Sequence, residues 1–296
     1  MADHKKETGK GTSLNGAWAD LGPVRKEKQD RVARGERKSG LPWVLSASRR
    51  TDMVGCFPHV LTDRLRSFRP EEVHSLVLWT KNPGNILAEG PLKEILLQFK
   101  QIYIHLTITG MGGGEFEPMI PLWQTTVEQI PLLIRFVKSP ARITWRFDPI
   151  LTVSGKGKRF SNFDLFPILV HRIAPLGIPS CRVSWVSPYP KVVRRLAGKG
   201  WELVAETEEE RAAQAQKLKE EAERYGMALH FCAMEGFPVS RCIDGGLLRQ
   251  LHPDGRECSQ AKAKGQRVHC GCTESLDIGW YSLRCAHQCL YCYACP

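Results

Sequence analysis

The stretch from Cys285 to Pro296 reads C-A-H-Q-C-L-Y-C-Y-A-C-P. It places thiols at Cys285, Cys289 and Cys292, and an aromatic residue, Tyr291, stands directly before the third thiol. Thiolates are the usual ligands of iron–sulfur clusters, and in a 4Fe–4S cluster each ligand binds a different iron. Three thiols on one short loop therefore predict a 4Fe–4S cluster with one iron left open.

The spacing C-x3-C-x2-C with an aromatic residue before the last cysteine resembles the cluster motif of the radical S-adenosylmethionine enzymes. In that superfamily the three cysteines hold a 4Fe–4S cluster, and S-adenosylmethionine chelates the open iron. An electron from the cluster then cleaves the cofactor to a 5'-deoxyadenosyl radical, which implies a reductant such as flavodoxin or ferredoxin. The resemblance assigns Cys285, Cys289 and Cys292 to the cluster and Tyr291 to the cofactor site. The superfamily, however, normally carries this motif near the start of its barrel.

The chain also resembles, from about Leu45 to Ala294, a prokaryotic family defined only as a domain of unknown function. This resemblance implies a cofactor and leaves the substrate open, whether it is a small molecule or a macromolecule. Besides the terminal cysteines, the segments that carry the resemblance are S-x-S-R-R-T-D at Ser46–Asp52, W-T-K-N-P at Trp79–Pro83, W-R-F-D-P-I at Trp145–Ile150 and C-G-C at Cys270–Cys272.

Short apolar runs alternate along the chain with amphipathic stretches, which predicts an α/β fold with a parallel sheet. A doubly wound sheet and a barrel both fit this alternation. Polar residues follow most of the predicted strands, as expected at a ligand-binding barrel rim, so we predict a six-unit (β/α) partial barrel over residues 41–235. The radical S-adenosylmethionine enzymes have such a core. We expect strands over Trp43–Ser48, Ser75–Thr80, Ile102–Thr109, Ala141–Phe147, Cys181–Val186 and Ala228–Met234, and helices over Pro58–Ser67, Asn85–Phe99, Leu122–Val137, Phe163–Ala174 and Glu206–Tyr225.

Charged side chains directly after the predicted strands are the candidate catalytic residues. Arg49 and Asp52 follow the first strand, Lys81 follows the second, and Arg146 and Asp148 lie at the end of the fourth. An arginine offers a planar fork that suits a carboxylate or a phosphate, so one of these residues would hold the cofactor carboxylate or an anionic substrate. An internal ion pair is the alternative for Arg146 and Asp148.

A glycine-rich loop follows the third predicted strand and ends in Gly113, Gly114 and Glu115. It resembles the G-G-E segment with which radical S-adenosylmethionine enzymes bind the methionine amino group. Glycines allow a ligand to approach the backbone, and a glutamate accepts hydrogen bonds from an ammonium group. A surface loop without a ligand is the alternative.

Nine of the eleven cysteines lie from Cys232 onward, in a chain whose start, M-A-D-H-K-K-E, lacks a secretory signal. Such thiols are more plausibly metal ligands than disulfide partners. Residues 236–296 have little periodicity, and we predict a Cys-rich iron–sulfur segment that packs on the barrel mouth and is ordered by metal. Four thiols in addition to the terminal motif would supply a second 4Fe–4S cluster, namely Cys232, Cys242, Cys270 and Cys272. For Cys232 alone, the alternative is a buried free cysteine that packs as a small hydrophobic residue.

Structural zinc is the alternative for the terminal motif. Cys289 and Cys292 would form half of such a site, and Cys270 with Cys272, or His287, would supply the rest. This alternative explains the thiols alone, whereas an iron–sulfur cluster also accounts for the triplet spacing, the aromatic residue and the upstream alternation of strands and helices. Cys56, Cys258 and Cys295 have no assigned role.

The formal net charge of +11 raises the question of nucleic-acid binding. Residues 1–40 hold ten Lys and Arg against six Asp and Glu, so +4 lies on a predicted disordered tail and the other +7 is spread over 256 residues. A solvated basic surface is the simpler interpretation. The alternative function is a zinc- or iron–sulfur-stabilised nucleic-acid-binding or repair protein without radical chemistry. No run approaches the roughly 20 apolar residues of a membrane span, so we expect a cytoplasmic protein without membrane contact.

Overall fold

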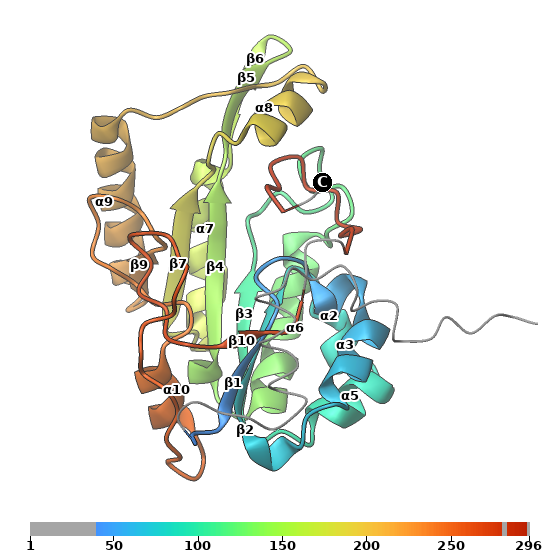
Figure 1. The fold of residues 1–296 in the computed structure, drawn as a ribbon. Helices are drawn as coiled ribbons and strands as arrows, with labels where there is room; N and C mark the ends of the chain where they lie inside the picture. Colours follow the sequence, from blue (N-terminus) through green and yellow to red (C-terminus); the bar gives the residue numbers. More distant parts are fainter. Residues whose placement is uncertain (1–39, 280–282, 295–296) are drawn as a thin grey trace, which may run out of the picture. The chain divides into compact units, whose positions relative to one another are not determined.

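The computed structural model describes residues 40–279 and 283–294, and the described residues from 42 onward form one compact unit. The tail predicted over residues 1–40 lies, except for Gly40, outside the described residues, and so does Cys295. The described residues have the predicted α/β fold, with a seven-stranded sheet at its centre (Figure 1).

The strands of this sheet pair in parallel, in the order β10-β1-β2-β3-β4-β7-β9. From β1 to β9 the chain therefore moves steadily across the sheet, without the reversal of strand order that defines a doubly wound sheet. The apolar runs explain these strands, since all eight residues of β2 are buried, as expected for a sheet covered on both faces. The strands are β1 (Trp43–Ala47), β2 (Val73–Thr80), β3 (Ile102–Thr107), β4 (Ile143–Ile150), β7 (Ser180–Trp185), β9 (Ala228–Phe231) and β10 (Leu276–Asp277).

Helices connect the successive parallel strands, and α6 and α7 lie behind the sheet in the view of Figure 1. The best-capped helix is α9, where the Thr207 hydroxyl accepts from the Glu210 backbone and the Glu210 carboxylate accepts from the Thr207 backbone. The helices are α2 (Met53–Cys56), α3 (Pro58–Leu65), α4 (Gly84–Leu87), α5 (Pro91–Leu96), α6 (Trp123–Val137), α7 (Phe166–Ile173), α8 (Pro190–Ala197), α9 (Glu208–Arg224) and α10 (Gly245–Leu251).

The segment after β9 covers the other face of the sheet, which we call the inner face and define by Val77, Trp79 and Tyr103. These side chains share one core cluster with residues of the covering segment, among them Ile243 and Leu248. In Figure 1 this segment, orange to red, runs in front of the strands. It then adds β10 to the sheet beside β1, and Cys242, Cys258, Cys270 and Cys272 of this segment pack in the same core cluster against the sheet.

A second, smaller sheet was not predicted. Strands β5 (Thr152–Gly155), β6 (Lys158–Ser161) and β8 (Glu202–Leu203) pair antiparallel beyond the end of β4. The turn between β5 and β6 is S-G-K-G-K, and its central residues Gly155, Lys156 and Gly157 all have positive φ. Helix α8, which was also not predicted, packs with this sheet in a core cluster that includes Val153, Val192 and Trp201.

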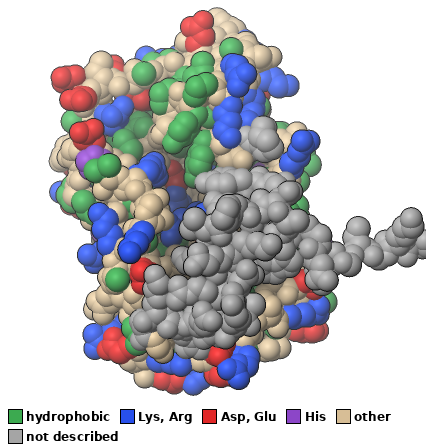
Figure 2. Space-filling model, viewed as in Figure 1, with side chains coloured by type: hydrophobic (Ala, Val, Ile, Leu, Met, Phe, Trp, Pro, Cys, Tyr) green, Lys and Arg blue, Asp and Glu red, His purple; other side chains and the backbone are tan. Residues whose placement is uncertain are grey.

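The surface is mixed in charge on the face shown in Figure 2. Outside the grey residues, Lys and Arg side chains occur in separate groups with Asp and Glu among them. Such a distribution is typical of a solvated basic surface rather than of one continuous stripe for a phosphate backbone. In the described part of the chain, no helix has the length and apolar character needed to span a membrane.

Candidate functional site

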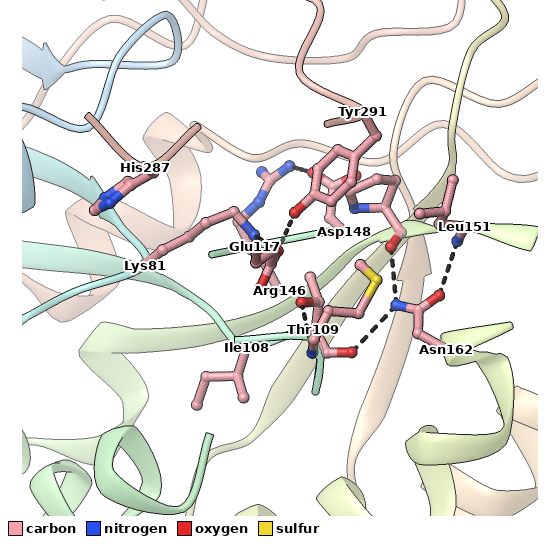
Figure 3. A network of polar contacts seen from close by, with 12 residues as sticks. Lys81, Ile108, Thr109, Glu117, Arg146, Asp148, Leu151, Asn162, His287 and Tyr291 are labelled. Carbon is pink, nitrogen blue, oxygen red and sulfur yellow. Dashed lines mark hydrogen bonds and ion pairs between the residues drawn. The ribbon is translucent and has the colours of Figure 1, made fainter. Parts of the chain in front are cut away.

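The cysteine loop, residues 285–292, lies against the carboxyl ends of β1, β2 and β3. His287 Nε2 donates to Asp52 Oδ2 at 2.8 Å, directly after β1. The Tyr291 hydroxyl donates to Glu117, in the loop after β3 (Figure 3). The Leu290 amide donates to the carbonyl of Phe116 at 3.0 Å. The loop therefore lies at the edge where parallel α/β folds bind their ligands.

Apolar packing and one arginine also fix this loop. Cys289, Leu290 and Tyr291 are buried in the core cluster formed with α8 and the small sheet. Arg195 on α8 donates to the carbonyls of Cys289, Leu290 and Cys292 at 3.4, 3.2 and 2.9 Å. A guanidinium that binds three carbonyls of one turn fixes the backbone that carries the thiols.

The three thiols of the terminal motif differ in exposure. Cys289 is 7% exposed, and burial raises its thiol pKa, whereas Cys285 and Cys292 are half-buried. A hydrogen bond from Cys56 lowers the pKa of Cys285 to about 6. Two thiolates on one zinc ion lie at most about 4.6 Å apart, because each zinc–sulfur bond is about 2.3 Å. Cys285, Cys289 and Cys292 do not form a group of ligand atoms within 4.8 Å of one another, so they do not converge on a single zinc ion.

A different group does converge. Among the described residues, Cys56, Cys285 and His287 are the one set of three Cys, His, Asp or Glu side chains whose ligand atoms all lie within 4.8 Å of one another. The sulfurs of Cys56 and Cys285 are 3.6 Å apart. Asp52 binds the His287 ring, as carboxylates commonly do beside a metal-bound histidine. These three residues could therefore bind one metal ion. The sequence prediction left Cys56 unassigned and named His287 only in the zinc alternative.

Asp52, a predicted catalytic residue, connects three parts of the site. Its Oδ1 accepts from the Gly55 amide at 2.7 Å and caps α2. Its Oδ2 accepts from the Thr80 hydroxyl at 3.0 Å, from the Lys81 amide at 2.8 Å and from His287. The carboxylate is 8% exposed and joins the loop after β1, the end of β2 and the cysteine loop.

Lys81 and Glu117 form the ion pair beneath Tyr291 (Figure 3). Lys81 Nζ lies 2.7 Å from Glu117 Oε1, and the Glu117 side chain is 1% exposed. The predicted residue in this loop was Glu115, which is exposed and pairs with Lys156 of the small sheet. Gly113 and Gly114 lie in a tight turn, where the Gly114 amide donates to the Met111 carbonyl and the Gly113 amide donates to the Glu117 carbonyl. Sequence reasoning therefore selected the exposed glutamate and missed the buried one two residues later.

Arg146 and Asp148 form an ion pair on the inner face, which was the alternative considered for them. Asp148 also accepts from the Ser184 hydroxyl. The Arg146 guanidinium lies 4.9 Å from the centre of the Trp79 ring, and His105 stacks on that ring at 4.1 Å. Arg49 also lies near the Trp79 ring, at 5.9 Å from its centre, and donates to Gln266 and Ser275, so it ties the first loop to the covering segment.

The four cysteines predicted for a second cluster come together on the inner face. Their side chains are between 2% and 9% exposed. The sulfurs of Cys232 and Cys242 are 3.4 Å apart, and Cys272 Sγ accepts from the Cys242 amide at 3.3 Å. Hydrogen bonds from Cys232 and Cys272 hold the pKa of the Cys242 thiol well below its usual value. A hydrogen bond from Cys272 lowers the pKa of Cys270 to about 6.

The chain belongs to the family described as Domain of unknown function (DUF1848), which matches residues 60–294. This match confirms the predicted membership of a family of unknown function, and it extends from α3 through the cysteine loop. No curated protein matches the chain, and no solved structure matches it.

Proposed function

We propose that this chain is an iron–sulfur enzyme of the radical S-adenosylmethionine type. One observation carries the proposal: the loop with Cys285, Cys289 and Cys292 lies at the carboxyl edge of a parallel sheet, beside buried charged groups. The three sulfurs are also spread too widely for one zinc ion. The sequential strand order from β1 to β9 supports the six-unit partial barrel that such enzymes use.

In this proposal the cysteine loop holds the cofactor, and the substrate binds beside it at the carboxyl edge of the sheet. With its fourth iron open, a bound 4Fe–4S cluster would chelate S-adenosylmethionine and supply the electron for its cleavage to a 5'-deoxyadenosyl radical. Arg195 and Glu117 would keep the loop in place, because they bind its carbonyls and its tyrosine hydroxyl.

The test is anaerobic reconstitution with iron and sulfide, followed by dithionite, S-adenosylmethionine and chromatography for 5'-deoxyadenosine. The wild-type chain should form 5'-deoxyadenosine, and a variant with Cys285, Cys289 and Cys292 all replaced by alanine should form none. Cys181→Ala is the matched control, since Cys181 is fully buried in β7, away from the loop. Product from the triple variant would show that other thiols hold the cluster, and its absence from wild type would refute the proposal.

The convergence of Cys56, Cys285 and His287 favours a second candidate, a zinc-stabilised nucleic-acid-binding or repair protein without radical chemistry. Cys56→Ala separates the two candidates. It should leave the iron content and product of the radical enzyme in place, but it would remove the metal from a zinc site at these residues. The second candidate also requires nucleic-acid affinity that falls steeply with salt, measured by fluorescence anisotropy on the purified chain.

A further inference from the structure

Four buried thiols lie together on the inner face, in a different core cluster from the terminal cysteine loop. Cys232 follows β9, Cys242 precedes α10, and Cys270 and Cys272 lie just before β10. They pack against Val77, Trp79 and Tyr103 of the sheet. The chain thus returns three times to the same part of the inner face, and each return brings cysteine.

Two buried arginines flank these thiols. Arg146 Nη1 donates to Cys242 Sγ at 3.4 Å. The neighbouring Arg182, on β7, is 5% exposed, and its Nε and Nη1 have no hydrogen-bond partner. Removing a guanidinium from water without a partner is costly, so a buried arginine normally faces an anion. Four thiolates bound to iron supply such an anion, because their charge outweighs the positive charge of an iron–sulfur core.

The four sulfurs form a row and do not converge on one point. No three of the four sulfurs have all their separations within 4.8 Å, although any two ligands of a single zinc lie within about 4.6 Å of each other. The contacts run instead from Cys232 to Cys242, to Cys272 and to Cys270. An extended row of four thiols suits a centre that contains more than one metal.

We propose that Cys232, Cys242, Cys270 and Cys272 bind a second iron–sulfur cluster, fully ligated by protein, on the inner face beside Arg146 and Arg182. None of its ligands belongs to the terminal loop, so the test of this cluster is separate from the test of the radical chemistry proposed above. Four thiolate ligands serve both two-iron and four-iron clusters, and an iron count distinguishes these two forms.

The test uses the full chain that lacks the terminal ligands, with Cys285, Cys289 and Cys292 replaced by alanine. After anaerobic reconstitution it should retain about two or about four irons per chain and an equal amount of sulfide. Reduction of the cluster should then give an electron paramagnetic resonance signal. Adding Cys242→Ala and Cys272→Ala should remove the iron and the signal. Adding Cys258→Ala should not, although Cys258 is buried in the same core cluster. Retention of zinc alone, or of no metal, in the triple variant would overturn the proposal.

A second variant keeps the test valid if loss of Cys242 and Cys272 unfolds the chain. Arg182→Met removes the positive charge beside the cluster and keeps the bulk of the side chain. It should shift the midpoint potential of the signal to a more negative value, because the reduced cluster loses a stabilising charge, whereas Arg182→Lys should restore much of the shift. Equal potentials in wild type, Arg182→Met and Arg182→Lys would overturn the placement of the cluster beside this arginine.

Discussion

Asp52→Asn tests the hydrogen-bond network that holds the cysteine loop on the sheet. Asp52 Oδ2 accepts from three donors, at Thr80, Lys81 and His287, while Oδ1 accepts from the Gly55 amide. An asparagine has one carbonyl oxygen and one amide nitrogen in the same volume. Whichever position the amide nitrogen takes, it faces at least one hydrogen-bond donor and cannot accept from it. The backbone amides of Gly55 and Lys81 are fixed by the fold and cannot turn to another acceptor.

The magnitude follows from these contacts. A buried amide left without a partner costs about 1–3 kcal/mol, and loss of a hydrogen bond to a charged group costs about 1.5–3 kcal/mol. Because the Thr80 hydroxyl can turn to another acceptor, we expect the free energy of unfolding to fall by about 3 kcal/mol. Urea unfolding, followed by circular dichroism, measures this change.

The control is Asp63→Asn, which removes the exposed ion pair with Arg66 and should change the free energy of unfolding by no more than about 0.5 kcal/mol. A double-mutant cycle with His287→Ala should give a coupling energy of at least about 1 kcal/mol between Asp52 and His287. An Asp52→Asn protein as stable as Asp63→Asn would refute the view that this carboxylate anchors the loop.

Three further changes have defined outcomes. Tyr291→Phe removes the hydroxyl that donates to buried Glu117, so the free energy of unfolding should fall by about 1.5–3 kcal/mol in urea. Burial lowers the pKa of His252 to about 4, so the folded state binds this proton less readily than the unfolded state, and stability should fall as the pH drops from 6.5 to 4. His252→Asn should make that part of the stability profile less steep. Gly112→Ala would place a Cβ 2.1 Å from the Pro121 carbonyl, and should lower the thermal midpoint by several degrees.

Each of these changes has a matched control. Glu115→Gln alters the exposed neighbour of Glu117 and should leave stability within about 0.5 kcal/mol of wild type. His171→Asn replaces an exposed histidine and should leave the free energy of unfolding at about pH 7 within about 0.5 kcal/mol of wild type. Gly157→Ala meets positive φ but no atom within 4 Å, so its cost should stay near 1–2 kcal/mol, roughly that of the strained backbone alone. Equal effects in a variant and its control would contradict the corresponding contact.

The six main strands could be predicted because burial on both faces leaves apolar runs, as in β2, that have no other explanation. Elements without such a run were missed. The hairpin of β5 and β6 is mostly polar, and β10 has two residues, Leu276 and Asp277, too few for any pattern. Helix α8 begins at Pro190, a start signal that was overlooked.

At the site, residue types could be predicted better than partners. Cys285, Cys289 and Cys292 follow from their spacing, but the contact between Cys56 and Cys285 joins residues 229 positions apart. Local pattern carries no information on such a contact. Glu115 and Glu117 differ only in that a turn, closed by the Gly113 amide on the Glu117 carbonyl, exposes the first and buries the second.

The covering of the inner face by residues that follow β9 sets an order of events during translation. All six strands of the main sheet from β1 to β9 are synthesised before Ile243 and Leu248, which shield Val77, Trp79 and Tyr103. A nascent chain at that stage exposes an apolar sheet face that is prone to aggregation, and chaperones bind surfaces of this kind. The cluster proposed for the inner face would be loaded only after Cys270 and Cys272 have been synthesised, so its assembly would coincide with the covering of this face.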